Sequence, residues 1–176
     1  KADRVFRLCE DLAEDGGILL SFPNGIRADL MDRNLIRALK SAGTFRISYG
    51  IESGSPSLQK RIKKFLNLER AAEMVRWTAE EGVITGGFFM LGFPDETREE
   101  MEQTVKFACQ NPFHFASFFY VIPFPRTYMY KEAIRRGYTP GEIKSCLHSH
   151  LIGFHKPWIN LSSVDDEEFV KIKRSA

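Results

Sequence analysis

Strand-like runs of apolar residues alternate with helix-like stretches along this chain, and this alternation limits its fold more than any other feature. Successive runs lie roughly 30 residues apart, which leaves room for one helix between each pair. Strands joined in this way are parallel, and their crossovers are right-handed. The sequence therefore predicts an α/β fold, either part of a β/α barrel or an open doubly wound sheet. The expected strands are residues 18–22, 45–51, 83–91 and 115–122.

Several helix boundaries are marked by residues that can cap them. Asp32 and Asn67 each precede an amphipathic stretch and can accept a hydrogen bond from its first turn. Thr97 and Glu100 have the spacing of a capping box, which predicts the start of a third helix. We expect another helix over residues 127–137.

The composition is that of an ordinary globular protein. Hydrophobic residues make up 43% of the 176 residues, which excludes a disordered chain. The apolar runs all fall well short of the roughly 18 residues that a membrane span needs. The formal charge of +2 gives no strong signal for nucleic-acid binding.

Three widely separated cysteines exclude a disulfide framework and indicate reduced thiols in a cytoplasmic protein. Cys9 and Cys109 fall on apolar helix faces, so we expect both to be buried. Cys146 lies among three histidines in residues 146–155. A zinc site there would need a second pair of ligands, which this segment lacks. We therefore expect a solvated loop around Cys146 and no metal ligands in the chain.

Parallel α/β folds place their functional sites beyond the carboxyl ends of the strands. The second expected strand ends in Glu52 and Ser53, which are flanked by Gly50 and Gly54. Glycine lets a ligand approach the backbone, and a carboxylate there can accept hydrogen bonds from a ribose diol or an ammonium group. Glu52 could equally be a surface residue that pairs with a nearby Lys or Arg.

The other strand ends offer further candidates. Gly92 allows close approach at the end of the third strand, between apolar residues that could form a slot for a flat purine. Arg27 could hold a carboxylate in a bidentate fork, or it could pair with Asp29. We expect Asp95 and Glu96 to be first-turn residues of the next helix rather than a catalytic pair.

Four short motifs occur in order at these strand ends. They are R-A-D at 27–29, G-I-E-S at 50–53, F-x-x-G-F-P-x-E-T at 89–97 and P-x-P-x-T-x-x-Y at 123–130. In this order and spacing the sequence resembles the radical S-adenosylmethionine (radical SAM) enzymes, and in particular the subgroup often joined to a cobalamin-binding domain. The resemblance extends from about residue 4 to residue 137.

The resemblance implies a partial TIM-like barrel. Residues 1–137 would carry the third to the sixth of six parallel strands, and residues 138–176 would form a C-terminal extension with a final helix. In such enzymes a [4Fe-4S] cluster gives one electron to S-adenosylmethionine (SAM), which yields methionine and a 5′-deoxyadenosyl radical. The resemblance also makes cobalamin a candidate cofactor of the longer protein, whereas it does not identify the substrate.

The resemblance assigns cofactor contacts by position and leaves the catalytic residues unassigned. Glu52 and Ser53 would contact the ribose or the methionyl part of SAM, and Arg27 is a candidate for the methionyl carboxylate. The family usually has glycine where this chain has Arg126. Residues at two strand ends would line the adenine slot: Met90, Leu91, Gly92, Ile122 and Pro123.

The cluster of this family is held by the pattern C-x-x-x-C-x-x-C, which this sequence lacks. The three scattered cysteines cannot form such a loop around an iron–sulfur cluster. We therefore predict that the chain as given binds no cluster and is inactive. We also predict that the longer gene encodes the motif upstream of Lys1.

A barrel that begins at its third strand has an open edge at residues 18–22, with unpaired backbone groups. We expect the missing N-terminal part, a second copy of the chain, a swapped element or the chain's own tail to cover it.

Two other functions stay open from the residues alone. A non-catalytic binding or assembly module on the same scaffold would bind an adenosyl ligand weakly and hold no iron. An unrelated β/α-barrel hydrolase or lyase would use Glu52 together with Asp95 or Glu96 as its carboxylates.

Overall fold

Four parallel strands form one sheet in the computed structural model of the chain, which describes residues 2–150 and 159–175. The order in the sheet is β1-β2-β3-β4, so neighbours in the sequence are also neighbours in space. The predicted α/β fold with parallel strands is confirmed. The strands are β1 (Leu20–Ile26), β2 (Thr44–Glu52), β3 (Ile84–Leu91) and β4 (Phe115–Tyr120).

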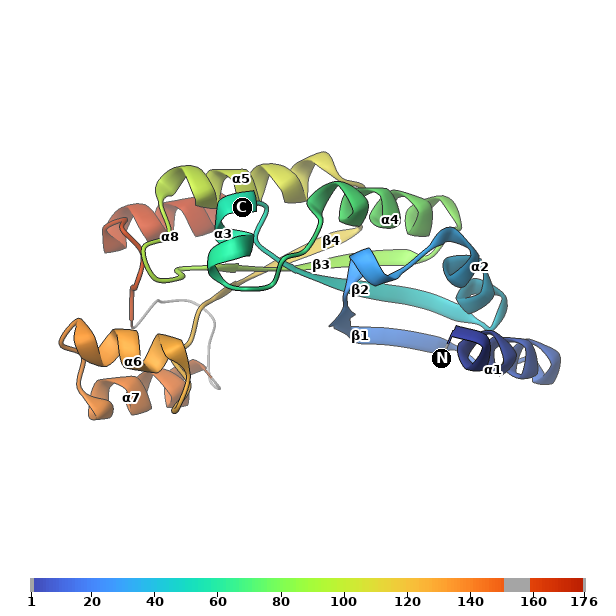
Figure 1. The fold of residues 1–176 in the computed structure, drawn as a ribbon, viewed down its shortest axis with the longest axis horizontal. Helices are drawn as coiled ribbons and strands as arrows, with labels where there is room; N and C mark the ends of the chain where they lie inside the picture. Colours follow the sequence, from blue (N-terminus) through green and yellow to red (C-terminus); the bar gives the residue numbers. More distant parts are fainter. Residues whose placement is uncertain (1, 151–158, 176) are drawn as a thin grey trace.

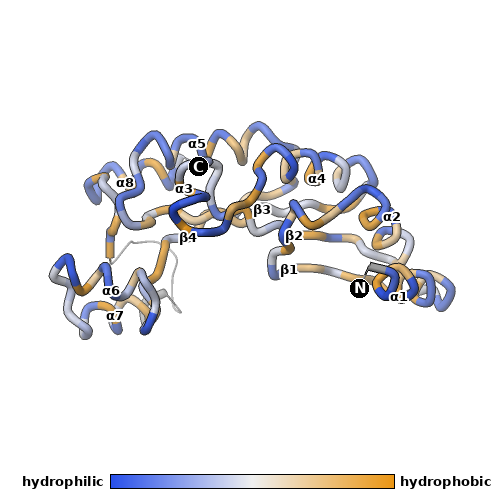
Figure 2. Tube along the Cα trace, in the orientation of Figure 1, coloured by the Kyte–Doolittle hydropathy of each residue, from blue (hydrophilic) through white to orange (hydrophobic). Residues whose placement is uncertain are grey.

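Helices cover one face of the sheet, as Figure 1 shows for α2, α4, α5 and α8. A sheet that is covered on one face in this way has the layering of a β/α-barrel wall, whose other face lines the barrel interior. In Figure 2 apolar colour follows the strands, whereas polar and apolar turns alternate along the helices. The helices are α1 (Ala2–Asp15), η1 (Ala28–Leu30), α2 (Arg33–Ser41), α3 (Pro56–Arg61), α4 (Leu68–Glu80), α5 (Arg98–Gln110), α6 (Tyr128–Arg135), α7 (Pro140–His150) and α8 (Asp166–Ser175).

The predicted helix caps are present. Asp32, Asn67 and Thr97 each accept a hydrogen bond from the backbone N–H three residues later, at 2.8, 2.9 and 3.3 Å. The Glu100 carboxylate completes the capping box by accepting from the backbone N–H of Thr97 at 3.1 Å. These local bonds satisfy N–H groups that have no partner inside a helix, which is why they are visible in the sequence.

The first strand differs from the prediction of residues 18–22. β1 begins at Leu20 and continues through Pro23 to Ile26. Between the pairs Phe22–Ile47 and Ile26–Tyr49, four steps along β1 face two steps along β2, so β1 bulges. Proline is tolerated at this place because β1 is an edge strand and the bulge interrupts its ladder.

Two cysteine predictions are wrong. Cys109 is exposed, because the buried stripe of α5 passes through Met101, Thr104 and Ala108 and leaves the next residue turned towards solvent. Cys146 is buried in α7, whereas we expected a solvated loop. The part of the histidine segment after residue 150 lies outside the described residues.

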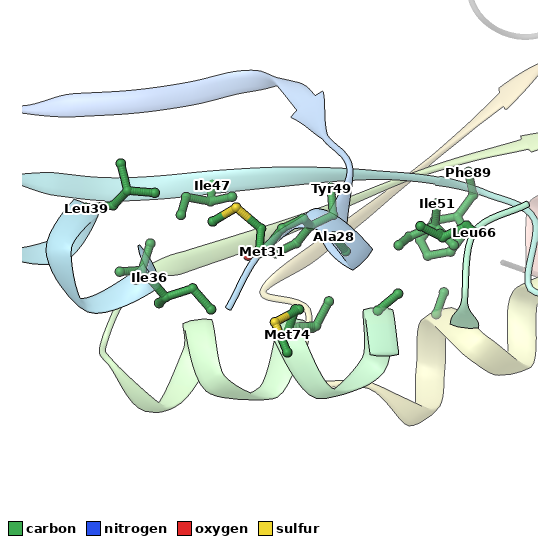
Figure 3. Close-up of a cluster of buried hydrophobic side chains, with 14 of the residues drawn as sticks. Ala28, Met31, Ile36, Leu39, Ile47, Tyr49, Ile51, Leu66, Met74 and Phe89 are labelled. Carbon is green, nitrogen blue, oxygen red and sulfur yellow. The ribbon is translucent and has the colours of Figure 1, made fainter. Parts of the chain in front are cut away.

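The main core lies between the sheet and α2 and α4. Figure 3 shows Ile36, Leu39 and Met74 facing Ile47 and Tyr49 of β2. The Tyr49 hydroxyl lies 2.7 Å from Oγ1 of Thr78, so the polar end of this buried ring has a partner. Burial raises the pKa of Tyr49 to about 12.

The C-terminal helix builds a second core on the sheet. Phe169 of α8 packs against β3 and α5, and its ring centroid lies 5.1 Å from that of Tyr120 on β4. Val164, Phe169 and Ile172 of the predicted extension are therefore packed onto the sheet, whereas Ile159 and Leu161 pack with α6 and α7. In the described parts of the chain, every helix is too short or too polar to cross a membrane.

Replacing Phe169 with alanine tests this packing. We expect Phe169→Ala to lower the free energy of unfolding by about 3–5 kcal/mol, because it leaves a cavity against the ends of two strands. Lys171→Ala, at an exposed position of the same helix, serves as the control and should change stability by less than about 0.5 kcal/mol. Urea denaturation measures both, and equal values for the two variants would contradict the packing.

Candidate functional site

Backbone strain gathers beyond the carboxyl ends of the strands. Five described residues other than glycine have positive φ: Glu52 (67°), Lys63 (58°), Phe65 (50°), Asp95 (56°) and Arg126 (68°). All five lie at the end of β2 or in the segments after β2, β3 and β4. Residues other than glycine seldom adopt this conformation, and such strain clusters at functional sites. The left-handed backbone at Arg126 fits the glycine that the radical SAM family usually has there.

An ion pair stands at the end of β2. The Lys64 ammonium donates to Oε1 of Glu52 at 2.8 Å, and both side chains are about a fifth to a quarter exposed, at 20% and 24%. The pair lies against Gly50, where a Cβ atom would come within 3.2 Å of Oε1 and 3.3 Å of Nζ. Glycine at this position therefore leaves room for the ion pair.

Arg27 belongs to the same group of residues. Its Nε and Nη2 donate to the two carboxylate oxygens of Asp29 at 2.9 and 2.7 Å, and its Nη1 donates to the backbone oxygen of Lys64 at 2.8 Å. These hydrogen bonds lower the pKa of Asp29 and raise that of Arg27. Lys64 thus connects two residues that the sequence singled out, Arg27 and Glu52. No periodicity or motif marked Lys64 itself.

Ser53 is fully buried and holds the loop after β2. Its hydroxyl lies 3.0 Å from Oγ1 of Thr104 and accepts from the backbone N–H of Ser55 at 3.0 Å. The Gln59 amide donates to the backbone oxygens of Ile51 and Ser53 at 2.8 and 2.7 Å. These hydrogen bonds connect the end of β2 to α3 and α5. Ser53 therefore helps to fix the backbone next to Glu52.

Glu96 holds the turn that follows β3. Its Oε2 accepts from the backbone N–H groups of Gly92 and Phe93 at 2.6 and 3.0 Å. Its side chain is completely buried, and its Oε1 has no partner among the described residues. Burial raises the pKa of Glu96 to about 8 and outweighs the two amide hydrogen bonds, which lower it. Sequence analysis placed Glu96 in a first helical turn and missed this role.

The two adjacent carboxylates do not form a catalytic pair. Glu96 is buried, whereas the Asp95 side chain is 72% exposed and pairs with Arg136 at 2.8 Å. General acid–base catalysis by two carboxylates needs both of them beside one substrate bond. The hydrolase or lyase alternative pairs Glu52 with one of these two carboxylates. In the structure Glu52 pairs with Lys64 instead, while Asp95 pairs with Arg136 and Glu96 binds two backbone amides.

The residues expected to line an adenine slot fall on different sides of the sheet. The side chain of Leu91 is fully buried against α8, so it does not line a slot at the strand end. Met90 is half-buried and points away from that core, and it packs near Phe93. Ile122 is half-buried and Pro123 is buried, just beyond β4. Alternation of side chains along a strand explains the split between Met90 and Leu91.

A cavity of about 440 Å³ opens at the same edge, which is within the range of small-molecule sites. Segments that follow β2, β3 and β4 all contribute to it. Its walls are mostly apolar, with charged groups at the rim. The lining includes Leu58, Arg61, Ile62, Lys63, Phe93 and Met129.

The described residues do not fit an iron–sulfur cluster. No group of three or more His, Cys, Asp or Glu side chains is placed to hold a metal in residues 2–150 and 159–175. Cys9 and Cys146 are buried on different helices, and burial raises the pKa of both thiols, which disfavours the thiolate that binds iron. Cys109 lies alone on α5.

Comparison with known proteins gives one family. The model of the Radical SAM superfamily matches residues 2–108. The chain is 33% identical over 118 residues to an uncharacterized methyltransferase of Pyrococcus horikoshii. The aligned region covers 67% of this chain and 26% of that relative. It is also 32% identical over 148 residues to cytidylyl-2-hydroxyethylphosphonate methyltransferase of Streptomyces wedmorensis. This alignment covers 80% of this chain and 27% of that relative. The chain thus spans about a quarter of the length of these relatives.

A solved structure shares the fold. The radical SAM methyltransferase TsrM of Kitasatospora setae, solved with cobalamin and a [4Fe-4S] cluster bound, matches with a TM-score of 0.64 at 18% identity. The match covers 74% of this chain and 27% of TsrM. The predicted partial TIM-like barrel is therefore confirmed.

The buried carboxyl of Glu96 predicts a dependence of stability on pH. The folded protein holds this proton up to a pH of about 8, whereas an unfolded glutamate loses it near about 4.3. The free energy of unfolding should therefore fall as pH rises between these values. Glu96→Gln keeps an uncharged acceptor for the two amides. It should remove the part of the decrease in unfolding free energy that comes from Glu96.

Urea denaturation of both proteins at several pH values between 5 and about 8 measures the difference. Glu102→Gln, which changes an exposed carboxylate of the adjoining helix, should keep the slope of the unaltered protein. Identical slopes for Glu96→Gln and the unaltered protein would show that Glu96 is charged in the fold.

Proposed function

The chain belongs to the radical SAM superfamily, and from this premise we propose that it forms part of an enzyme that cleaves SAM reductively at a [4Fe-4S] cluster to start radical chemistry on a substrate. The observation that carries the proposal is the Glu52–Lys64 ion pair, which stands over Gly50 at the carboxyl edge of the barrel wall. This is the edge where β/α barrels place their chemistry.

The residues at this edge suit an adenosyl ligand. Glu52 offers a carboxylate that can accept hydrogen bonds from ribose hydroxyls or from an ammonium group. Met90 and Ile122 are half-buried and offer apolar surface for a purine ring. When bound at a cluster, SAM supplies the carbon-centred radical, while the protein orients the ligand and excludes water from it.

The cluster ligands belong to another part of the protein in this proposal, since the described cysteines do not fit them. The methyltransferase names of the relatives and the cobalamin in TsrM support methyl transfer as the reaction class, with cobalamin bound outside this chain. Three unpaired cysteines support a cytoplasmic location.

The direct test is the formation of 5′-deoxyadenosine by the full-length protein after anaerobic reconstitution with iron and sulfide. Chromatography should detect this product when SAM and a reductant are present. Glu52→Gln should lower its rate by about tenfold or more, because a hydrogen bond to a charged group is lost. Glu69→Gln, at an exposed position of α4, is the matched control and should leave the rate unchanged.

The 176-residue chain by itself should bind no iron and form no product under the same conditions. A full-length protein that binds a cluster but never cleaves SAM would refute the proposed chemistry. Cluster binding by the 176-residue chain would refute the assignment of the ligands to another part of the protein.

We also propose that a second copy covers the edge of β1 when this chain is alone, since β1 has no described strand on its outer side. Leu19 is 77% exposed directly before β1. Sedimentation velocity should detect dimers, and Leu19→Lys should shift them towards monomers because a charge at a strand edge disfavours pairing. Leu30→Lys, at a residue that is 73% exposed in η1, is the control and should leave the proportion of dimers unchanged. A chain that is monomeric at every concentration would contradict this pairing.

A further inference from the structure

We propose that the inner side of the sheet binds a planar small molecule with an acidic group, and that this molecule is the substrate. The proposal rests on the proposed function and adds the chemical class of the substrate to it. The side chains concerned lie on the face of the sheet opposite α2, α4, α5 and α8 (Figure 1), which we call the lumen face. They are Arg46 and Ser48 of β2, Gly86 and Phe88 of β3, and Phe115, Ser117 and Phe119 of β4.

Alternation along the strands identifies the lumen face. Ile47 and Tyr49 of β2 pack in the core under the helices, and so does Phe89 of β3. Because successive side chains of a strand point to opposite faces, their neighbours on the same strands point into the barrel. Phe118 and Tyr120 pack on the helix side of β4, which directs the residues next to them towards the lumen.

Small residues line the lumen face where an ordinary β/α barrel has bulky ones. Such interiors are filled by layers of side chains, in which Val, Ile and Leu dominate. Here two successive rows of paired residues each hold one phenylalanine and two residues that are serine or glycine. The described part of the barrel therefore leaves space at its centre. The rows are Ser48–Gly86–Phe115 and Gly50–Phe88–Ser117.

The rings in these rows lie down on the sheet and do not fill that space. A Cβ at Gly86 would come within 2.2 Å of the Phe115 ring, so this ring covers the neighbouring strand. Phe88 reaches across β2, and its Cδ2 lies 3.3 Å from the Cβ position of Gly25 on β1. Ser48 is fully buried although it belongs to the lumen face, which agrees with such a cover. The half-buried rings thus form an apolar floor inside the barrel.

Phe119 stands upright beside this floor. Its ring makes an angle of 74° with that of Phe88, and the two centroids lie 5.8 Å apart. Aromatic rings prefer offset-stacked and edge-to-face contacts with one another. A floor of ring faces with an upright ring at its side therefore suits a ligand that is itself planar.

Arg46 supplies a charge for this ligand. Its guanidinium lies over the Phe115 ring, with Cζ 4.8 Å from the ring centroid. Its Nε is buried, and among the described residues the guanidinium has no hydrogen-bond or ion-pair partner. Withdrawing a cation from water without a counterion is costly, and the fork of a guanidinium matches the two oxygens of an acidic group. The lumen face therefore selects a ligand that carries such a group.

The position of Arg46 sets the length of the ligand. Its guanidinium lies at the level of Phe115, and the strand register places Phe115 in one row with Ser48. Ser48 comes four residues before Glu52, the last residue of β2. Four residues of a strand span roughly 13 Å. A ligand of about this length, held by Arg46 at its acidic end, has its other end at the carboxyl edge of the sheet.

Two dyes with the same rings test the proposal: 1-anilinonaphthalene-8-sulfonate, which is acidic, and N-phenyl-1-naphthylamine, which lacks the sulfonate. Fluorescence titration of the full-length protein, without SAM or reductant, measures both dissociation constants. We expect both dyes to bind, and the acidic dye to bind more tightly. Arg46→Gln should weaken the acidic dye by about 10- to 100-fold, the range for loss of one charge-assisted hydrogen bond. The same variant should change the neutral dye by less than about threefold.

Matched variants make the result specific. Arg46→Lys keeps the charge and should recover most of the affinity for the acidic dye. Arg76→Gln removes an exposed cation of α4 and should leave both dyes unchanged. Ser117→Phe adds a ring to the lumen face and should abolish the binding of both dyes. Ala116→Phe adds the same ring at the preceding, exposed position on the other face and should leave both unchanged.

Equal weakening of the two dyes in Arg46→Gln would overturn the proposal, and so would unchanged binding of the acidic dye. Full binding by Ser117→Phe would also overturn it, because the dyes would then bind elsewhere. An unaltered protein that binds neither dye would show that other parts of the protein fill the barrel, which overturns it as well. Dye binding needs neither cluster nor SAM. A protein that binds the dyes as expected but forms no 5′-deoxyadenosine would therefore refute the proposed function and not this binding site.

Discussion

Parallel strands cannot be joined by a tight turn, and this constraint determines the arrangement of the rest of the chain. Each connection has to return across the sheet, so the helices gather on one face, and all four carboxyl ends meet at one edge (Figure 1). The other face is left for the interior of the barrel. Arg27, Glu52 and the Gly92 turn come from three different strand ends, and only this topology brings them to one edge.

The turn after β3 is held from several directions at once. Glu96 binds two of its amides from inside, and the Phe169 ring of α8 occupies the space that a side chain at Gly92 would need, 2.6 Å from the Cβ position. The backbone N–H of Asp95 donates to the carbonyl of Leu161 at 2.9 Å. A C-terminal segment far along the chain thus rigidifies one side of the site. The Glu52–Lys64 pair at the end of β2 is partly exposed.

Local chemistry explains which features could be predicted from the sequence. The caps at Asp32, Asn67 and Thr97 act over three residues, so the sequence alone shows them. The short helix α3 was missed, because six residues are too few to display a helical period. Glu96 was misjudged for another reason. Acidic residues are common in a first helical turn, and only its complete burial reveals that it caps the preceding turn.

The sequence by itself determined the parallel α/β fold, the order of its elements, the caps and the glycine-flanked Glu52, because each depends on local spacing or on residue type. Only the tertiary structure decided which cation stands beside Glu52, since Lys64 reaches it from a loop whose path depends on the hydrogen bonds of Arg27 and Gln59. It also decided that Leu91 faces α8, because helix packing selects which alternate side chains of a strand are covered. Contacts between distant segments arise from packing, and a sequence pattern does not record them.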